Sequence, residues 1–228
     1  MIETTRTVIA IDGPAASGKS STAQWVAERL GFRHIDSGSL YRGLTTAMLR
    51  TGLPADEWTP RALVSQGGRV GLRPERTSFT VLIDGEPAEE ELRGSRVTEH
   101  VSLVARIQEV RAWVNERVSE AAAEHDVVVD GRDMGTAVFP DALLKVFLIA
   151  DPWERARRRL VQRLGRRPTD SEIAEETDQI VQRDSRDATQ TVQAADAVLL
   201  DTTYLTQEEQ VERIVALARA VTHRPHDT

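Results

Sequence analysis

The segment Gly13-Pro14-Ala15-Ala16-Ser17-Gly18-Lys19-Ser20 directly follows the apolar run Val8-Ile9-Ala10-Ile11. Its spacing, G-x-x-x-x-G-K-[ST], is that of a phosphate-binding loop between a buried strand and a helix. The glycines let the backbone curl so that several N–H groups point at one anion, and the following helix adds the positive end of its dipole. Lys19 supplies a charge for the outer phosphates, and Ser20 supplies a hydroxyl for Mg²⁺. The segment therefore predicts nucleotide binding.

The use of lysine supports this interpretation over a plain glycine-rich loop. The chain has 29 lysine and arginine residues, and only Lys19 and Lys145 are lysines. A guanidinium would crowd the phosphates, whereas an ammonium is compact. A chain that otherwise uses arginine thus has lysine where a point charge is needed.

The composition is that of an ordinary globular protein, with 40% hydrophobic and 29% charged residues in 228. This length suits one substantial domain with insertions. We find no run near the ~18 apolar residues that a membrane span requires, and no secretory segment. The net charge of −7 disfavours broad nucleic-acid binding, and the absence of cysteine excludes disulfides and thiolate metal sites. We expect a cytoplasmic monomer that binds neither nucleic acid nor membranes.

Apolar runs alternate with helical patterns along the chain, which predicts a parallel sheet with helices on both sides. Five strands are expected over 8–12, 32–36, 127–130, 144–149 and 197–201. Helices are expected over 20–30, 40–51, 152–164, 171–183 and 207–221. The fold class is therefore α/β, with a doubly wound five-stranded parallel sheet around the phosphate loop.

Two stretches depart from this alternation. Residues 54–111 combine short extended runs over 69–72 and 79–83 with helical patterns, notably 101–118, and we interpret them as a small α/β insertion. Residues 165–170 interrupt two helices with a Gly-Arg-Arg-Pro turn. The polar tail, 223–228, is expected to fray.

Polar residues follow the second expected strand. Asp36-Ser37-Gly38 stands at its end, and Leu40-Tyr41-Arg42 comes two residues later. Because ligands collect outside the carboxyl ends of strands, this segment should face the phosphate loop. Ser37 or Ser39 could instead cap the next helix, and Arg42 could reach an incoming phosphate.

A second polar group, Asp130-Gly131-Arg132-Asp133, follows the apolar run 127–129. An aspartate that closes a strand in such a protein usually holds Mg²⁺ through a water, although it could merely cap a turn. Arg132 and Asp133 bring a cation and a carboxylate to the same cleft, where they could contact a ligand or form a structural ion pair.

A third group, Arg183-Asp184-Ser185-Arg186-Asp187, comes after the arginine-rich helices. Its R-D-x-x-D spacing puts Arg183 and Asp187 on one helix face, either as a minor ion pair or as a grip on ribose hydroxyls. No Asn-Lys-x-Asp motif is present, which argues against a GTPase switch. No catalytic base stands out, as suits phosphoryl transfer.

Taken together, these motifs resemble the bacterial cytidylate kinases, the CMP/dCMP kinases of the nucleoside monophosphate kinase group. The resemblance rests on I-D-G-P-x-x-S-G-K-S at 11–20, D-S-G-x-x-Y-R at 36–42, G-E-x-x-x-E-E-L-R at 85–93, D-G-R-D-M-G-T-x-V-F-P-D at 130–141, R-D-x-x-D at 183–187 and A-A-D-A-V-L-L-D-T at 194–202. Their order and spacing cover nearly the whole chain.

The resemblance implies a single kinase domain over 1–228, a monophosphate-binding insertion at about 54–111, a short lid at about 158–184, and transfer from ATP to CMP or dCMP with Mg²⁺. It implies catalytic roles for Lys19, Arg132 and Arg158. ATP would bind Gly13, Pro14, Ala15, Ala16, Ser17, Gly18, Lys19, Ser20, Ser21 and the lid residue Arg158. Mg²⁺ would be held by Ser20 and Asp130. The acceptor would bind Ser37, Arg42, Ser102, Arg111, Arg132, Asp133, Arg183 and Asp187.

Within the acceptor set, Arg42 and Arg132 would hold the phosphate, whereas Arg183 and Asp187 would hold the ribose. Ser102, Arg111 and Asp133 would contact the cytosine edge. A carboxylate suits that edge because it accepts from the exocyclic amine that uracil lacks.

The chain departs from the family pattern at Gln190, where an arginine is usual three residues after the R-D-x-x-D aspartate. Losing a guanidinium at a phosphate removes a contact of roughly 1.5–3 kcal/mol, and Arg186 could substitute. This departure leaves two alternatives open. One is a related kinase with a modified pyrimidine monophosphate or another small phosphate acceptor, and the other is a P-loop nucleotide-binding regulator.

Overall fold

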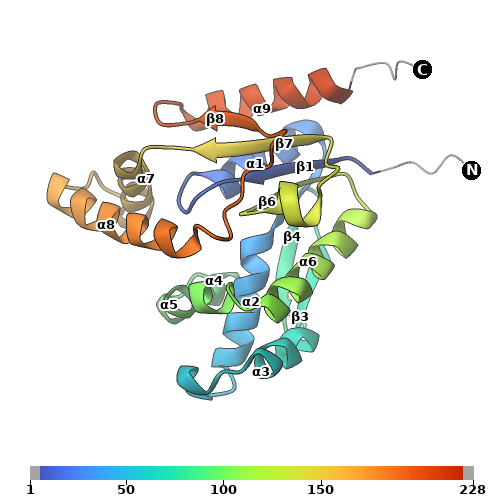
Figure 1. Cartoon of the computed structure of the whole chain (residues 1–228), viewed down its shortest axis with the longest axis vertical. Coiled ribbons are helices and arrows are strands. Elements are labelled where there is room, and N and C mark those ends of the chain that lie inside the picture. Colours follow the sequence, from blue (N-terminus) through green and yellow to red (C-terminus); the bar gives the residue numbers. More distant parts are fainter. Residues whose placement is uncertain (1–5, 223–228) are drawn as a thin grey trace, which may run out of the picture.

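Five parallel strands form a sheet in the order β2-β6-β1-β7-β8 (Figure 1). The structure is a computed structural model that describes residues 6–222, so the predicted tail lies outside the described residues. The α/β fold with a five-stranded parallel sheet is therefore confirmed. The strands are β1 (Val8–Asp12), β2 (Arg33–Asp36), β6 (Val127–Gly131), β7 (Leu144–Ile149) and β8 (Val198–Asp201).

Helices follow the strands as the alternating pattern predicts. Within residues 6–222, no helix is both long and apolar enough to cross a membrane. The helices are α1 (Lys19–Leu30), α2 (Ser37–Leu49), α3 (Pro60–Ser65), α4 (Glu89–Leu92), α5 (Ser95–Val104), α6 (Gln108–Ala123), α7 (Pro152–Leu164), α8 (Asp170–Asp187) and α9 (Gln207–Thr222), with short turns η1 (Ala55–Glu57), η2 (Gln66–Arg69) and η3 (Met134–Val138).

Strands β1, β6 and β7 are buried on both faces of the sheet, to which their successive side chains point in turn. Ile9 and Ile11 of β1 pack with the apolar faces of α1 and α9. Ala10, between them, belongs to a second cluster built with α2 and α6. Because all five strands are parallel, their carboxyl ends lie at one edge of the sheet, where the phosphate loop begins.

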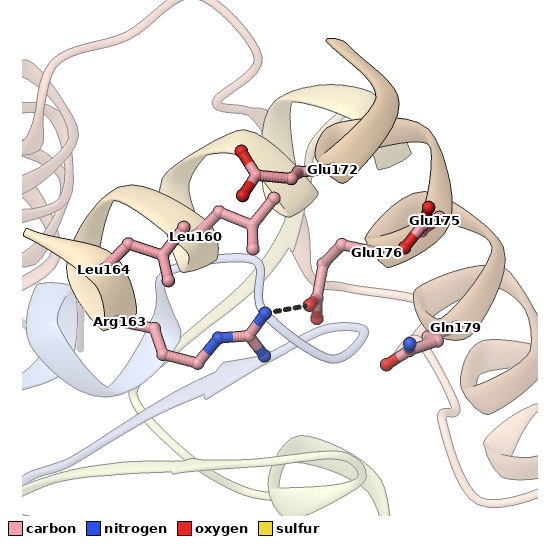
Figure 2. Close-up of a pocket in the computed structure, with 7 residues that line it drawn as sticks. All are labelled: Leu160, Arg163, Leu164, Glu172, Glu175, Glu176 and Gln179. Atoms are coloured by element: carbon pink, nitrogen blue, oxygen red, sulfur yellow. Dashed lines mark ion pairs between the residues drawn. The ribbon is translucent and has the colours of Figure 1, made fainter. Parts of the chain in front are cut away.

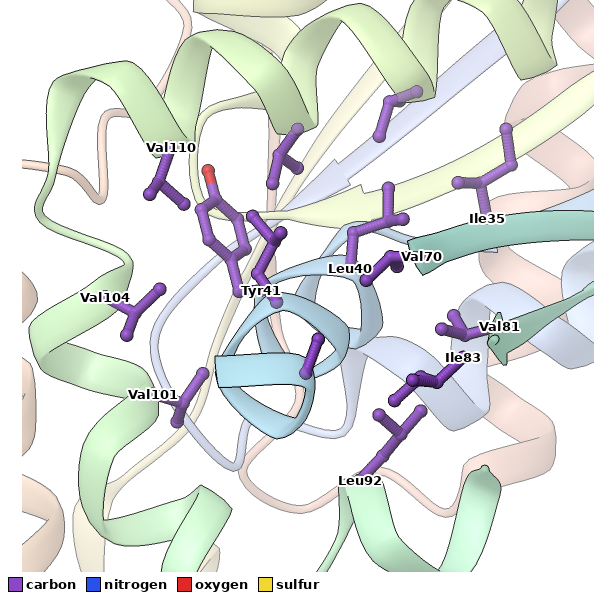
Figure 3. Close-up of a cluster of buried hydrophobic side chains, with 14 of the residues drawn as sticks. Ile35, Leu40, Tyr41, Val70, Val81, Ile83, Leu92, Val101, Val104 and Val110 are labelled. Atoms are coloured by element: carbon purple, nitrogen blue, oxygen red, sulfur yellow. The ribbon is translucent and has the colours of Figure 1, made fainter. Parts of the chain in front are cut away.

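A second, three-stranded antiparallel sheet lies between α2 and α6 in the chain. It consists of β3 (Val70–Pro74), β4 (Phe79–Ile83) and β5 (Glu86–Pro87), in that order. Asp84 and Gly85 both have positive φ, at 56° and 84°, as a tight hairpin turn requires. Val81 and Ile83 pack against α2, and Val101 and Val104 of α5 close the same cluster (Figure 3).

Helices α7 and α8 form a hairpin at the end of the molecule toward which β7 points (Figure 1). Gly165 ends α7 with a left-handed conformation, and Thr169 begins α8 through a capping box with Glu172. The two helices share a small apolar cluster of Ala156, Leu160, Ile173 and Ile180.

Three predicted boundaries were wrong. Helix α2 begins at Ser37 because Asp36 is the N-cap and accepts from the Ser39 N–H at 3.2 Å. The expected helix over 101–118 is two helices, α5 and α6, because Ile107 between them is extended, with φ −74° and ψ 120°. Helix α8 continues to Asp187, so the R-D-x-x-D motif forms its last turn.

Candidate functional site

The phosphate loop leaves β1 in a conformation that only its glycines allow. Gly13 has φ 149°, and a Cβ there would stand 2.3 Å from the carbonyl oxygen of Leu148 on β7. Gly18, with φ 86°, is the N-cap of α1. The loop is therefore pressed against the neighbouring strand and ends with the free N–H groups of α1 at the strand edge.

Lys19 lies along this loop. Its Nζ donates to the Pro14 carbonyl at 2.7 Å and contacts the Ser17 hydroxyl at 3.5 Å. Burial and the nearby positive charge of Arg132 together lower the Lys19 pKa to about 7, against the carboxylates of Asp130 and Asp12, which raise it. An ammonium held in this way gains its full charge when an anion arrives.

Asp12 anchors the segment after β6 to the end of β1. Its carboxylate accepts from the N–H groups of Met134 and Gly135, each at 2.8 Å. Burial raises the Asp12 pKa to about 6 despite these bonds. The loop after β6 is thereby fixed beside the phosphate loop.

Ser20 and Asp130 meet as the sequence predicts. The Ser20 hydroxyl donates to Asp130 Oδ2 at 2.7 Å, and His34 Nε2 lies 2.7 Å from Asp130 Oδ1. Burial alone would lower the His34 pKa, but the hydrogen bond and charge of Asp130 outweigh it and raise the pKa. Asp36 lies nearby, and burial followed by the charge of Asp130 raises its pKa.

This oxygen-donor set fits Mg²⁺. The ion prefers hard oxygen ligands, keeps several waters, and is usually bound by one or two carboxylates together with substrate phosphates. Within residues 6–222, no three carboxylates or histidines converge to hold a metal by themselves. The Ser20–Asp130 pair therefore fits an ion that arrives with a nucleotide.

Arg132 joins the phosphate loop to the end of α8. Its guanidinium donates to the Gly13 carbonyl at 2.9 Å and to Asp187 Oδ2 at 3.0 Å. Arg183 Nε lies 3.6 Å from the same carboxylate. Arg132 and Asp133 do not pair with each other, which removes one alternative interpretation of that motif.

Arg42 on α2 points into the same region. It donates to the Leu92 carbonyl at 3.1 Å and to the Thr98 hydroxyl at 3.2 Å. Burial lowers the pKa of Arg42, and the positive charge of Arg183 adds to this effect. Arginines whose positive charges lie this close together, away from water, favour the binding of an anion.

Arg111 of α6 forms an ion pair with Asp133, the residue after Arg132. The Tyr41 side chain of α2 rises toward α6 near Val110 (Figure 3). Among the described residues, its buried hydroxyl has no hydrogen-bond partner, and burial raises the Tyr41 pKa to about 12. Polar groups from α2, α6 and the β6 edge thus meet on the side of the sheet away from β8.

Three predicted serines are engaged elsewhere or make no contact with the acceptor residues. Ser37 is buried and donates to the Asp130 carbonyl at 2.8 Å, so its hydroxyl is engaged with the strand. Ser21 is exposed and bonds Gln207 of α9 at 3.2 Å. Ser102 lies on α5, and we see no hydrogen bond or ion pair from it to another predicted site residue within 6–222.

The arginines of α7 divide between two directions. Arg158 donates to the carbonyls of Thr202 and Thr203, on the segment after β8. Arg155 is buried instead against the phosphate loop, where it donates to the Ala15 carbonyl at 2.8 Å and pairs with Asp184 at 2.6 Å. Asp184 accepts in turn from the Ala15 N–H at 3.2 Å.

Sequence reasoning did not single out Arg155 or His34. For His34 a signal existed. Residues two apart in a strand point to the same face of the sheet, so His34 must lie on the same face as Asp36, next to the polar end of the strand. For Arg155 no comparable signal existed, because five arginines compete along the segment 155–163.

Comparison with known proteins agrees with this geometry. A family model described as cytidylate kinase matches residues 9–220. The cytidylate kinase of Chlorobaculum tepidum is 41% identical to this chain and is covered over 96% of each chain. That of Caldanaerobacter subterraneus subsp. tengcongensis is 40% identical over 92% of this chain and 94% of its own length.

A solved structure of an uncharacterized protein from Eubacterium ventriosum has the same fold, with a TM-score of 0.50 and 12% identity. It is similar over 96% of this chain and 100% of its own. At that identity the likeness concerns the fold alone.

Proposed function

This chain belongs to the cytidylate kinase family, and on that premise we propose that it transfers the γ-phosphoryl group of ATP to CMP or dCMP, giving ADP and CDP or dCDP. One observation supports this most directly. Arg132 bridges the phosphate loop and the end of α8, at Gly13 and Asp187. A cation between the phosphate loop and the acceptor-binding residues suits transfer between two nucleotides, because both carry negatively charged phosphates.

The donor side of the site is the phosphate loop. Residues 13–18 and the N-terminus of α1 present N–H groups, and Lys19 supplies charge to the β- and γ-phosphates. Ser20 and Asp130 would hold Mg²⁺ and its water shell, and the ion would offset charge on the phosphate oxygens when bound. The chain's own contribution is to hold these oxygens in place before the nucleotide arrives.

The acceptor side follows from the sheet order. Arg42 and Arg132 would hold the CMP phosphate, and Ser102, Arg111 and Asp133 would contact the cytosine edge, with Ser37 in the same acceptor site. Arg183 and Asp187 would hold the ribose. Arg42, Arg111 and Arg132 come from the β6–β2 side of the central strand, and α8 adds Arg183 and Asp187, so the two nucleotides can approach the loop from opposite sides.

The base of ATP must then lie on the β7–β8 side. Arg158 and the segment 202–205 occupy that side, and we propose that Arg158 contacts ATP outside its phosphates, joined by Ser21 at the start of α1. Arg155 keeps the loop in place through Ala15, and closure of the α7–α8 hairpin would exclude water from the reacting phosphates.

No general base is needed in this arrangement. The acceptor phosphate is already an oxyanion, so the protein has to align it with the γ-phosphate and neutralise charge in the transition state. We further propose that the protein acts as a monomer in the cytoplasm, on small-molecule nucleotides.

Coupled ADP-release assays across the common nucleoside monophosphates test the proposal. We expect turnover with CMP and dCMP, and slower turnover with UMP, which cannot donate to Asp133 from an exocyclic amine. Turnover with neither CMP nor dCMP would reject the acceptor assignment. ATP hydrolysis that no monophosphate accelerates would instead favour a nucleotide-binding regulator.

A further inference from the structure

A histidine stands behind the Ser20–Asp130 pair. His34 lies in β2, is 8% exposed, and reaches from beside Val128 to the Asp130 carboxylate two residues further along β6. Its Nε2 donates to Asp130 Oδ1 at 2.7 Å, while Asp130 Oδ2 accepts from Ser20 at 2.7 Å. Each carboxylate oxygen therefore has one short partner, and the two partners lie on different secondary-structure elements.

The backbone of His34 is fixed as firmly as its ring. Its N–H donates to the Thr77 carbonyl at 2.9 Å, and it forms an isolated bridge with Ser78, just before β4. The main chain of His34 therefore has a fixed position beside β6, which limits how far its ring can follow the carboxylate if Asp130 rotates. The histidine acts as a fixed donor, and fixed donors set the rotamer of a buried acceptor.

We propose that His34 is a positioning residue that holds the Asp130 carboxylate toward Ser20, so that the pair is prearranged for the Mg²⁺ of the bound nucleotide. The inference rests on the proposed function for the presence of that ion. Groups that hydrogen-bond metal-binding carboxylates orient them, and their loss weakens metal binding without removing any ligand.

The surroundings explain why a donor is needed at this point. Asp36 is paired in register with Asp130 across β2 and β6, so two carboxylates meet at one strand edge. An Asp130 oxygen left without His34 would be a buried acceptor facing a like charge, and rotation away from Ser20 would relieve it. The hydrogen bond from His34 supplies the missing donor, so Asp130 has no energetic reason to rotate.

Calorimetry with ATP separates this role from general packing. The dissociation constant is measured with excess Mg²⁺ and again in EDTA, for the wild type, His34→Leu and His34→Gln. We expect His34→Leu to weaken Mg·ATP binding about tenfold and to change metal-free ATP binding less than about twofold. His34→Gln can place an N–H near the same oxygen and should restore most of the loss.

Two controls complete the design. Ile35→Val alters the neighbouring buried residue on the opposite face of β2 and should change neither constant. In an Asp130→Asn background, adding His34→Leu should have no further effect on the Mg²⁺ dependence, because coupled residues are not additive. If His34→Leu does not fold, His34→Asn takes its place, since asparagine is polar but too short to reach Asp130.

Equal losses with and without Mg²⁺, or no loss in either condition, would overturn the proposal. So would failure of His34→Gln to recover binding. Because the titration follows ATP and not CMP turnover, an incorrect acceptor assignment would leave this result standing.

Discussion

The phosphate-loop edge of the sheet and the α7–α8 hairpin are built by different forces. At the edge, Asp12, Asp130 and Ser20 bond to partners on other strands or helices, above an apolar core that fills both faces of the sheet. The hairpin has only the small cluster around Leu160 and Ile180. Geometry at the edge is thus set by packing, whereas the hairpin depends on charge.

The charge in the hairpin centres on Glu176. Its side chain is 3% exposed and forms ion pairs with Arg163 at 2.9 Å (Figure 2) and with Arg159 at 3.3 Å. A cavity of about 110 Å³ lies beside it, between the two helices. Partly exposed ion pairs open at lower cost than an apolar core, so the hairpin should open locally before the sheet does.

The largest expected effect comes from removing the positive charge of Lys19 at the phosphate-loop edge. Lys19→Ala should lower kcat by about 10²–10³-fold or more, because the ammonium that neutralises the transferring phosphate is lost. Coupled ADP release measures the rate, and thermal unfolding should show an unchanged fold.

Lys145→Ala is the matched control, since it removes the chain's other lysine. Lys145 is buried under Asp196, with its Nζ 2.8 Å from the carboxylate, and serves the fold. This variant should lose about 1–3 kcal/mol of stability and keep its kcat. A normal rate in Lys19→Ala would remove Lys19 from the catalytic group.

These two regions also differ in how well the sequence predicts them. The loop and the strands around it are encoded locally, by glycine spacing and by apolar runs, and β7 lies over the predicted residues, 144–149. The Ser20–Asp130 contact spans 110 residues, yet it was predictable because carboxyl ends of neighbouring parallel strands share an edge.

The partners in the hairpin could not be predicted in this way. Arg155 and Arg158 are three residues apart on one helix, and nothing local tells which of them reaches Ala15 and which reaches Thr202. That choice depends on the rotation of α7 against the sheet. The break between α5 and α6 was also missed, because the apolar residues of the two helices together keep the spacing of a single helix.

A smaller effect should come from removing the negative charge of Glu176 in the α7–α8 hairpin. Glu176→Gln keeps the shape but leaves Arg159 and Arg163 without their carboxylate, and since both arginines are partly exposed the loss should be about 1–2 kcal/mol. Hydrogen exchange should rise about tenfold over 152–187 and stay unchanged in β1 and β6.

Glu175→Gln is the control for this variant, because Glu175 lines the same cavity but is exposed (Figure 2). It should leave exchange unchanged throughout. An equal rise in β1 and in the hairpin after Glu176→Gln would show that the two regions open as one unit, and the contrast between them would fail.

The smallest expected effect concerns the edge again, where the geometry is prearranged but the charge is not. Burial and Arg132 lower the Lys19 pKa to about 7, so at pH 8 most of the protein without nucleotide has a neutral Lys19. Phosphates favour the ammonium, and ATP binding should take up about one proton at pH 8 and almost none at pH 6. Calorimetry in buffers of different ionisation enthalpy measures this uptake, and Lys19→Ala subtracts the titration of ATP itself. Uptake that persists in Lys19→Ala, or that does not grow between pH 6 and pH 8, would mean that the ammonium is charged before the nucleotide arrives and that the edge is prearranged in charge as well as in shape.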